Sequence, residues 1–234
     1  MSNQIMMIVS LRVAPSDEAR FTEFYHHSYI PALLAAAPEI ESVWRYEEFG
    51  VTGSLRWFNK QFLTHYLFRP GVSLQDIAGL MQRPGRQAQV LEWTHWSQNH
   101  LVNVERHCFK EIYRHPREPI GGIFGSRPFF RVSVQTEPHE TDAFNDWYHN
   151  QYLPKIMADV PAWAATRRYA SMDREPGLVH TVYEVESVQA LDEAFLLMRA
   201  PYRFSSNADW DAWVGKAITW QDATSFRPIY RAPN

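Results

Sequence analysis

The stretch FTEFYHHSYIP, Phe21 to Pro31, decides the fold because it occurs again, in altered form, as FNDWYHNQYLP, Phe144 to Pro154. When Phe144 is placed under Phe21, several chemically distinctive residues coincide. The matched pairs are Tyr25 with Tyr148, His26 with His149, Tyr29 with Tyr152 and Pro31 with Pro154. Self-similarity at a fixed offset is the mark of a repeated structural unit. The sequence therefore predicts two copies of one unit in tandem.

The likeness extends beyond this stretch, but its register changes. Arg45 falls over Arg168 in the same alignment, whereas Trp93 falls over Trp210 only after a shift. The first copy must therefore hold extra residues, and we place them in FGVTGSLRWFNK, residues 49–60. Insertions in repeats map to surface loops, and such loops often carry function. Trp57 in this insertion is accordingly a candidate substrate-binding residue.

Each copy reads as strands and helices in the same order. Apolar, β-rich stretches of the first copy predict strands at residues 5–13, 42–49, 61–68 and 104–113. Helical spacing and helix-forming residues predict helices at residues 18–36, 73–82 and 85–98, and Pro31 should kink or break the first. The second copy gives strands at 127–136, 163–171, 178–185 and 219–230, and helices at 142–158, 188–199 and 207–216.

This order, β-α-β-β-α-β with one additional helix, is the ferredoxin-like arrangement of an α+β protein. A four-stranded sheet with helices on one face leaves its other face bare, and burying that face requires a second sheet. We therefore expect two tandem ferredoxin-like units packed sheet to sheet as an internal α/β barrel. Residues 1–115 would form the first repeat, residues 116–126 a linker and residues 127–234 the second repeat.

Composition narrows the class of protein. Of the 234 residues, 45% are hydrophobic, and the formal net charge of −3 provides no basic field for nucleic acid or anionic lipid. The single cysteine, Cys108, excludes an intramolecular disulfide and fits a reducing compartment. No basic leader and no apolar run of about 18 residues is present, so we expect a cytoplasmic protein with no membrane span.

The repeated stretch resembles a known family. Trp147, Tyr148 and His149, followed by a proline, are similar to the tryptophan-tyrosine-histidine run of the EthD-like branch of the dimeric α/β-barrel superfamily. The first copy has the same run with phenylalanine in place of tryptophan. The family's second histidine is replaced by Tyr29 and Tyr152. The resemblance covers both copies and implies a fold that serves monooxygenases, lactone isomerases, polyketide cyclases and heme-handling proteins.

The matched tyrosines stand four residues apart and therefore share one helix face. A tyrosine combines an apolar body with a weakly acidic hydroxyl that can polarise a carbonyl or hold an enol. The alternative is simple packing, with the hydroxyl bonded to backbone. We take Tyr25 and Tyr29 as candidate catalytic residues, and Tyr148 and Tyr152 as candidate substrate-binding residues.

Histidines and arginines complete the candidate site. His26 and His149 are candidate acid–base residues because histidine titrates close to neutral pH, and a solvated helix histidine is the alternative. His65, in a predicted strand, is a third catalytic candidate whose side chain points either into the barrel or out of it. Arg45 and Arg168 are matched candidates for binding a carboxylate or phenolate, with a strand-edge salt bridge as the alternative.

The sequence was searched for cofactor-binding and metal-binding motifs, and one residue stands out. The sequence shows no CxxC or HxxxH pair at metal-ligand spacing and no GxGxxG loop, so we expect no cofactor and no metal. The exception is His95, between Trp93 and Trp96, which could serve as the axial ligand of a heme.

These observations favour a cofactor-independent enzyme that acts on a small aromatic or polyketide-like compound by His/Tyr acid–base chemistry. The reaction would be of isomerase, cyclase, lyase or dehydratase type, with monooxygenation as a further option. The alternatives are a heme-binding protein or oxygenase, and a non-catalytic small-molecule-binding or assembly module. The expected partner is a small apolar or aromatic molecule, and a homodimer of such chains is allowed. Features without a match in the second copy fall in the first copy, where we expect the principal site.

Overall fold

The structure is a computed structural model that describes residues 4–50, 59–80, 83–115, 125–174 and 177–232. Trp57 lies outside the described residues, as do most of the predicted insertion and most of the predicted linker. Within the described part of the chain, no helix is long and apolar enough to cross a membrane.

The chain divides into two compact units, each of which contains strands and helices. The N-terminal unit comprises Ser2–Phe49, Leu55–Lys110 and Pro228–Asn234. The C-terminal unit comprises Glu111–Arg227. The two longest strands therefore each contribute to both units. The predicted division of the chain into repeats, with the first ending at residue 115 and the second beginning at residue 127, stays a prediction.

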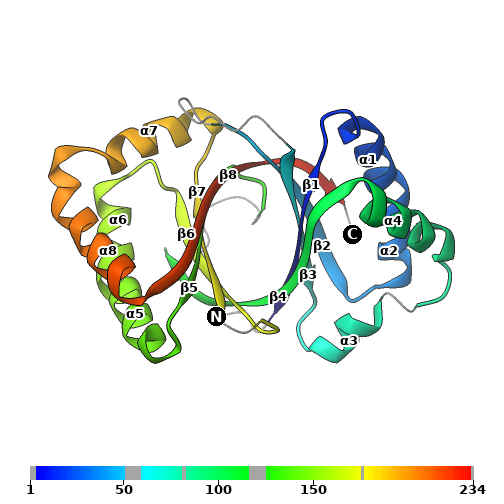
Figure 1. Ribbon diagram of the computed structural model, residues 1–234, viewed down its shortest axis with the longest axis horizontal. Helices are drawn as coiled ribbons and strands as arrows, with labels where there is room; N and C mark the ends of the chain where they lie inside the picture. The colour runs from blue at the N-terminus through cyan, green and yellow to red at the C-terminus, as the bar shows by residue number, and fades with distance from the viewer. Residues whose placement is uncertain (1–3, 51–58, 81–82, 116–124, 175–176, 233–234) are drawn as a thin grey trace. The chain divides into compact units, whose positions relative to one another are not determined.

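The N-terminal unit has the predicted order of elements. Its strands are β1 (Ile5–Val13), β2 (Ile40–Glu48), β3 (Lys60–Phe68) and the first part of β4 (Leu101–His115). Its helices are α1 (Glu18–Phe24), α2 (Ile30–Ala36), α3 (Leu74–Gly79) and α4 (Gln87–Asn99). Antiparallel pairing joins β4 to β1, β1 to β3 and β3 to β2. Helices α1, α2 and α4 lie together on one face of this sheet (Figure 1).

The C-terminal unit repeats this succession. Its strands are β5 (Phe129–Thr136), β6 (Ala165–Ser171), β7 (Leu178–Glu184) and most of β8 (Ile218–Ala232). Its helices are α5 (Thr141–Trp147), α6 (Leu153–Asp159), α7 (Val188–Met198) and α8 (Phe204–Ala217), with short 3-10 turns η3 (Pro138–Glu140) and η5 (Pro201–Arg203). Antiparallel pairing joins β8 to β5, β5 to β7 and β7 to β6. The fold class is therefore α+β, as predicted.

Within the N-terminal unit the strands lie in the order β2-β3-β1-β4, and within the C-terminal unit they lie in the order β8-β5-β7-β6. The predicted sheet-to-sheet packing of two tandem units remains a prediction.

The first long helix is interrupted by a π-helical turn, η1 (Tyr25–Tyr29), rather than by a break at Pro31. Pro31 has no N–H, and its ring would collide with a carbonyl of the preceding turn in a regular helix. The wider turn relieves this conflict, and Pro31 becomes one of the first residues of α2. The C-terminal unit has the same arrangement around Pro154, with the π-helical turn η4 (Tyr148–Tyr152) ahead of α6. Single π turns in α-helices frequently mark functional sites.

The core of the N-terminal unit lies between this helix and the sheet. Phe21 is fully buried, and its ring centroid lies 5.2 Å from that of Tyr25 and 5.3 Å from that of Trp96. Apolar burial of this kind contributes about 25 cal/mol for each Å² removed from water. The packing fixes the π turn against the sheet, and with it the side chains of the candidate site.

Candidate functional site

A cavity of about 210 Å³ lies inside the N-terminal unit, between the π turn and the sheet. Most of its lining is apolar, with tyrosine hydroxyls and one guanidinium as the polar groups. The lining residues are Met7, Val9, Tyr25, Tyr29, Leu33, Tyr66, Ile77, Leu80, Trp93, Val104 and Arg106. An apolar cavity with a few convergent polar groups is the usual form of a small-molecule site.

Two tyrosine hydroxyls meet at this cavity. Tyr25 comes from the π turn and Tyr66 from β3, and their hydroxyl oxygens lie 2.7 Å apart in a hydrogen bond. Both side chains are almost fully buried. Burial and then the neighbouring Tyr29 raise the pKa of Tyr25 to about 12, and burial raises the pKa of Tyr66 well above its ordinary value. Both hydroxyls therefore keep their protons at neutral pH and are hydrogen-bond donors.

Tyr29 forms the third tyrosine wall, stacked on the Tyr25 ring with centroids 5.2 Å apart. The guanidinium of Arg86, which immediately precedes α4, lies 5.1 Å from the centre of the Tyr29 ring. Burial raises the pKa of Tyr29, while the charge and hydrogen bond of Arg86 and the charge of Arg106 act in the opposite direction. Tyr29 thus sits beside two cations at the cavity.

His26 does not line this cavity and is hydrogen-bonded to Arg45. Nη1 of Arg45 lies 2.9 Å from Nε2 of His26. Since a guanidinium only donates, Nε2 must accept and the imidazole is neutral. Burial, and then the charge of Arg45, lower the pKa of His26 to about 3. A histidine in this state is a weak base and an already bound acceptor, so its position supports a structural role.

Arg45 itself is completely buried among aromatic rings. Its guanidinium carbon lies 4.5 Å from the centre of the Phe62 ring and 5.2 Å from that of Tyr25. Burial lowers its pKa to about 10, which leaves it charged at neutral pH. Thr22 accepts a second hydrogen bond at 3.2 Å. Among the described residues, Nε and Nη2 of Arg45 find no acceptor, so His26 is a principal partner of this cation.

The π turn also exposes a backbone group, and a tyrosine binds it. In a π turn the carbonyl of His26 would accept from the N–H of residue 31, which is a proline and has none. The hydroxyl of Tyr230 donates to this carbonyl at 3.2 Å. The Tyr230 ring also stacks on the His26 imidazole, with centroids 4.0 Å apart. Tyr230 therefore supplies the hydrogen bond that Pro31 cannot donate.

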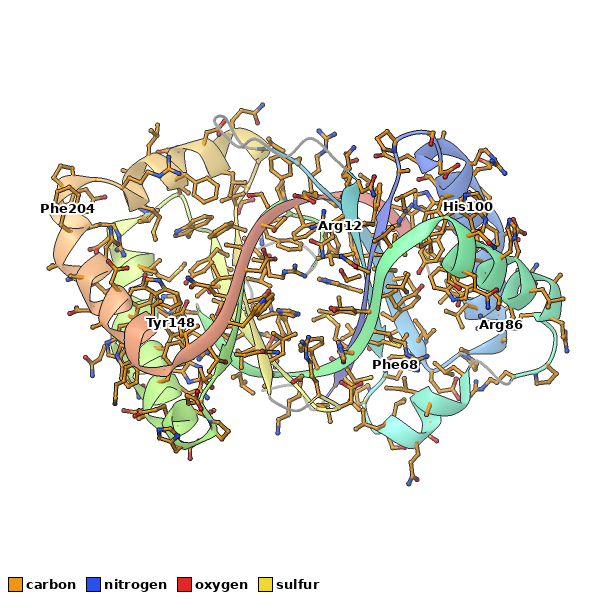
Figure 2. The ribbon with its side chains drawn as sticks, viewed as in Figure 1. Arg12, Phe68, Arg86, His100, Tyr148 and Phe204 are labelled. Atoms are coloured by element: carbon orange, nitrogen blue, oxygen red, sulfur yellow. The ribbon has the colours of Figure 1, made fainter. Side chains whose placement is uncertain are left out.

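The C-terminal unit reproduces this arrangement with the matched residues. The hydroxyls of Tyr148 and Tyr183 lie 2.8 Å apart, and Tyr148 sits between the helices and strands of its unit (Figure 2). Nη1 of Arg168 lies 2.6 Å from Nε2 of His149, whose pKa is lowered to about 4 by burial and then by Arg168. Tyr152 stacks on Tyr148 with ring centroids 5.1 Å apart.

His65 is buried on the other face of β3. It stands opposite Trp44 of β2, whereas Thr64 and Tyr66, its neighbours, stand opposite Arg45 and Val43 on the helix side. Alternation along a strand places consecutive side chains on opposite faces. The structure therefore does not bring His65 together with the three tyrosines of the cavity.

His95, the candidate heme ligand, lies on the exposed side of α4. Its Nδ1 lies 3.2 Å from Nδ2 of Asn99, one turn further along. Its neighbour Trp93 lines the cavity, but His95 does not. Among the described residues no group of three or more His, Cys, Asp and Glu side chains could hold a metal ion.

Several residues of the site escaped the sequence-based prediction, namely Tyr66, Arg86, Trp93 and Arg106. A signal for two of them was present. In the register that aligns Trp93 with Trp210, Tyr66 falls over Tyr183 and Arg86 falls over Arg203. Arg203 is also fully buried and forms an ion pair with Asp159 at 2.7 Å.

Comparison with known proteins identifies the fold. No protein-family model and no curated protein matches the sequence. An anthrone oxidase-like protein of known structure superposes with a TM-score of 0.70 at 13% identity, covering 99% of this chain and 93% of that one. A proposed monooxygenase of Fusobacterium nucleatum gives 0.60 at 6% identity, with coverage of 100% and 95%. A proposed monooxygenase of Lactobacillus acidophilus gives 0.55 at 11%, with coverage of 99% and 96%. Likeness over the whole length at such low identity establishes a shared fold.

Proposed function

We propose that the chain is a cofactor-independent enzyme of small aromatic or polyketide-like metabolism, and that the cavity of the N-terminal unit is its active site. The observation that carries the proposal is the buried hydroxyl pair of Tyr25 and Tyr66 in an apolar cavity. Neutral, preorganised donors in a site shielded from water stabilise negative charge that develops on a substrate oxygen. We further propose that the chain is a tandem duplication of an EthD-like unit.

The reaction would be proton transfer next to a carbonyl, as in an isomerisation or cyclisation. One hydroxyl of the pair donates to the other, and the second would donate its own proton to the carbonyl oxygen as it becomes an enolate, while water at the mouth of the cavity takes the proton from carbon. His26 is not assigned as the base, because its Nε2 is bound to Arg45 and its pKa is lowered to about 3. The proposal thus rests on the tyrosines of the cavity.

Oxygen insertion into an electron-rich phenol or anthrone is the second candidate reaction. The full-length superposition on an anthrone oxidase-like protein favours it. The same tyrosine donors would then hold the ionised substrate oxygen. Two measurements separate the reactions. Oxygen insertion predicts oxygen uptake in the presence of anthrone, whereas proton transfer predicts deuterium exchange into an aryl ketone.

Tyr66→Phe is expected to lower turnover about 100-fold, because it removes one preorganised donor from the developing oxyanion. The measurement is deuterium incorporation into 2-tetralone in D2O, followed by NMR. The matched control is Tyr183→Phe, which breaks the corresponding hydroxyl pair of the C-terminal unit. Equal loss in both variants would contradict a single active site in the N-terminal unit, and exchange at the buffer rate in the unmodified protein would contradict the proton-transfer reaction.

Leu33→Trp is expected to abolish binding of 2-tetralone, because Leu33 lines the cavity and an indole would fill it. Overpacking should also lower the free energy of unfolding by about 1–3 kcal/mol. Ile156 is the residue matched to Leu33 and is equally buried, so Ile156→Trp provides the same strain in the other unit. Binding measured by titration calorimetry should survive in Ile156→Trp. Retained binding in Leu33→Trp would place the ligand elsewhere.

A further inference from the structure

The cavity of the N-terminal unit is surrounded by positive charge. Arg106 lines it directly, and the fully buried Arg86 lies against Tyr29, which lines it too. Arg45 lies behind Tyr25, with its guanidinium carbon 5.2 Å from the ring centre. Among the described residues that line the cavity, none carries a carboxylate. Three cations around an apolar space create a potential that favours an anion, because charge inside a low-dielectric site is poorly screened.

Arg106 is placed to reach a ligand while it remains solvated. It stands on β4 opposite Val9 of β1, and Val9 is part of the cavity floor. Its side chain is exposed, so it lies at the mouth rather than in the interior. Glu105, the adjacent residue, projects from the other face of the strand by alternation. Among the residues that the structure describes, Arg106 has no ion pair that would compete with a ligand.

The polar groups of the cavity are therefore divided between two ends. The Tyr25 and Tyr66 hydroxyls are neutral donors at its buried side, and the Arg106 guanidinium is a charged donor at its mouth. Strand β1, which carries Met7 and Val9, lies between β3, which carries Tyr66, and β4, which carries Arg106. A ligand complementary to this arrangement has an apolar, flat body, an oxygen acceptor at one end and an anionic group at the other.

We propose that the substrate class of this site is an aromatic carboxylate, whose carboxylate group binds Arg106 at the cavity mouth while its ring fills the cavity. Arginine suits this role because its planar fork donates two parallel hydrogen bonds to a carboxylate. This inference rests on the proposed function, since it names the substrate of the same cavity. It adds the anionic group, which that function does not require.

The test compares 2-naphthoate with its neutral amide, 2-naphthamide, by titration calorimetry. The unmodified protein should bind the carboxylate about tenfold more tightly than the amide, which corresponds to about 1.4 kcal/mol. Arg106→Gln should abolish this preference without weakening amide binding. Added salt should reduce the affinity for the carboxylate alone, because the arginine is exposed. Lys110→Gln, a change of an exposed cation on the same strand, should keep the preference.

The outcomes separate this inference from the proposed function. If both probes bind with equal affinity and Arg106→Gln changes neither, the carboxylate assignment is overturned while the cavity stands as a binding site. If carboxylate preference persists in Arg106→Gln, or if Leu33→Trp leaves carboxylate binding intact, the anion binds elsewhere and the assignment also fails. If neither probe binds the unmodified protein, both the assignment and the cavity are contradicted.

Discussion

His26→Leu is expected to lower the free energy of unfolding by about 3 kcal/mol. Arg45 is fully buried, and His26 accepts its Nη1 hydrogen bond at 2.9 Å. Removing the partner of a buried charge leaves that charge uncompensated in a low-dielectric environment, which is strongly destabilising. The loss should appear in urea unfolding as a lower midpoint with an unchanged slope.

Three matched variants identify the cause of this loss. His26→Gln keeps an acceptor at the same place and should restore most of the stability. His27→Leu changes the neighbouring, exposed histidine and should shift the stability by less than about 0.5 kcal/mol. Arg45→Met combined with His26→Leu removes the charge together with its acceptor and should be more stable than His26→Leu alone. If the double variant is no better than His26→Leu, the hydrogen bond to Arg45 is not the reason for the loss.

Acidification from pH 7 to pH 5 is expected to destabilise the fold through His26 and His149. The pKa of His26 is lowered to about 3 and that of His149 to about 4, in both cases first by burial. In the unfolded chain both would titrate near pH 6.5. Between these values the unfolded state binds more protons, so stability is present above pH 6.5 and falls as the pH falls. With allowance for solvent screening, the two histidines together should contribute about 2–3 kcal/mol of this loss by pH 5.

The control for this pH dependence is the double variant His26→Gln with His149→Gln. Glutamine accepts the arginine hydrogen bond but does not titrate, so the stability of the double variant should change much less between pH 7 and pH 5. Chemical unfolding at each pH, monitored by tryptophan fluorescence, gives both curves. Two parallel curves would show that these histidines do not cause the acid sensitivity.

The elements of the fold could be predicted well from the sequence because their signals are local. Strand β3 was expected at residues 61–68 and spans Lys60–Phe68, and α7 was expected at residues 188–199 and spans Val188–Met198. The first helix shows a feature that local sequence signals predicted only in part. Pro31 predicts a disturbance, but the disturbance is a π turn that begins six residues earlier, because the wider turn relieves the collision between the Pro31 ring and the preceding turn.

The candidate site could be predicted only in part because its contacts join distant residues. Tyr25, Tyr29 and Arg45 lie against one another in the N-terminal unit, and the matched Tyr148, Tyr152 and Arg168 do so in the C-terminal unit, since repetition preserves positions. The role of His26 could not be seen, because it depends on Arg45 of another element, which lies against it only in the folded chain. Arg86 stands in a short polar segment whose sequence carries no helix face, so only tertiary packing reveals that it is buried against Tyr29.

The end of β8 has a consequence for how the chain is made. Residues 228–232 belong to the N-terminal unit, and within them Tyr230 covers His26 and binds its carbonyl. On a ribosome, the unit that contains the cavity is therefore nearly all synthesised early yet is completed only when these late residues emerge. Until then its first helix keeps an unbound carbonyl and an uncovered imidazole. Contacts between residues so far apart in sequence also slow folding, so the nascent first half must wait for its last strand.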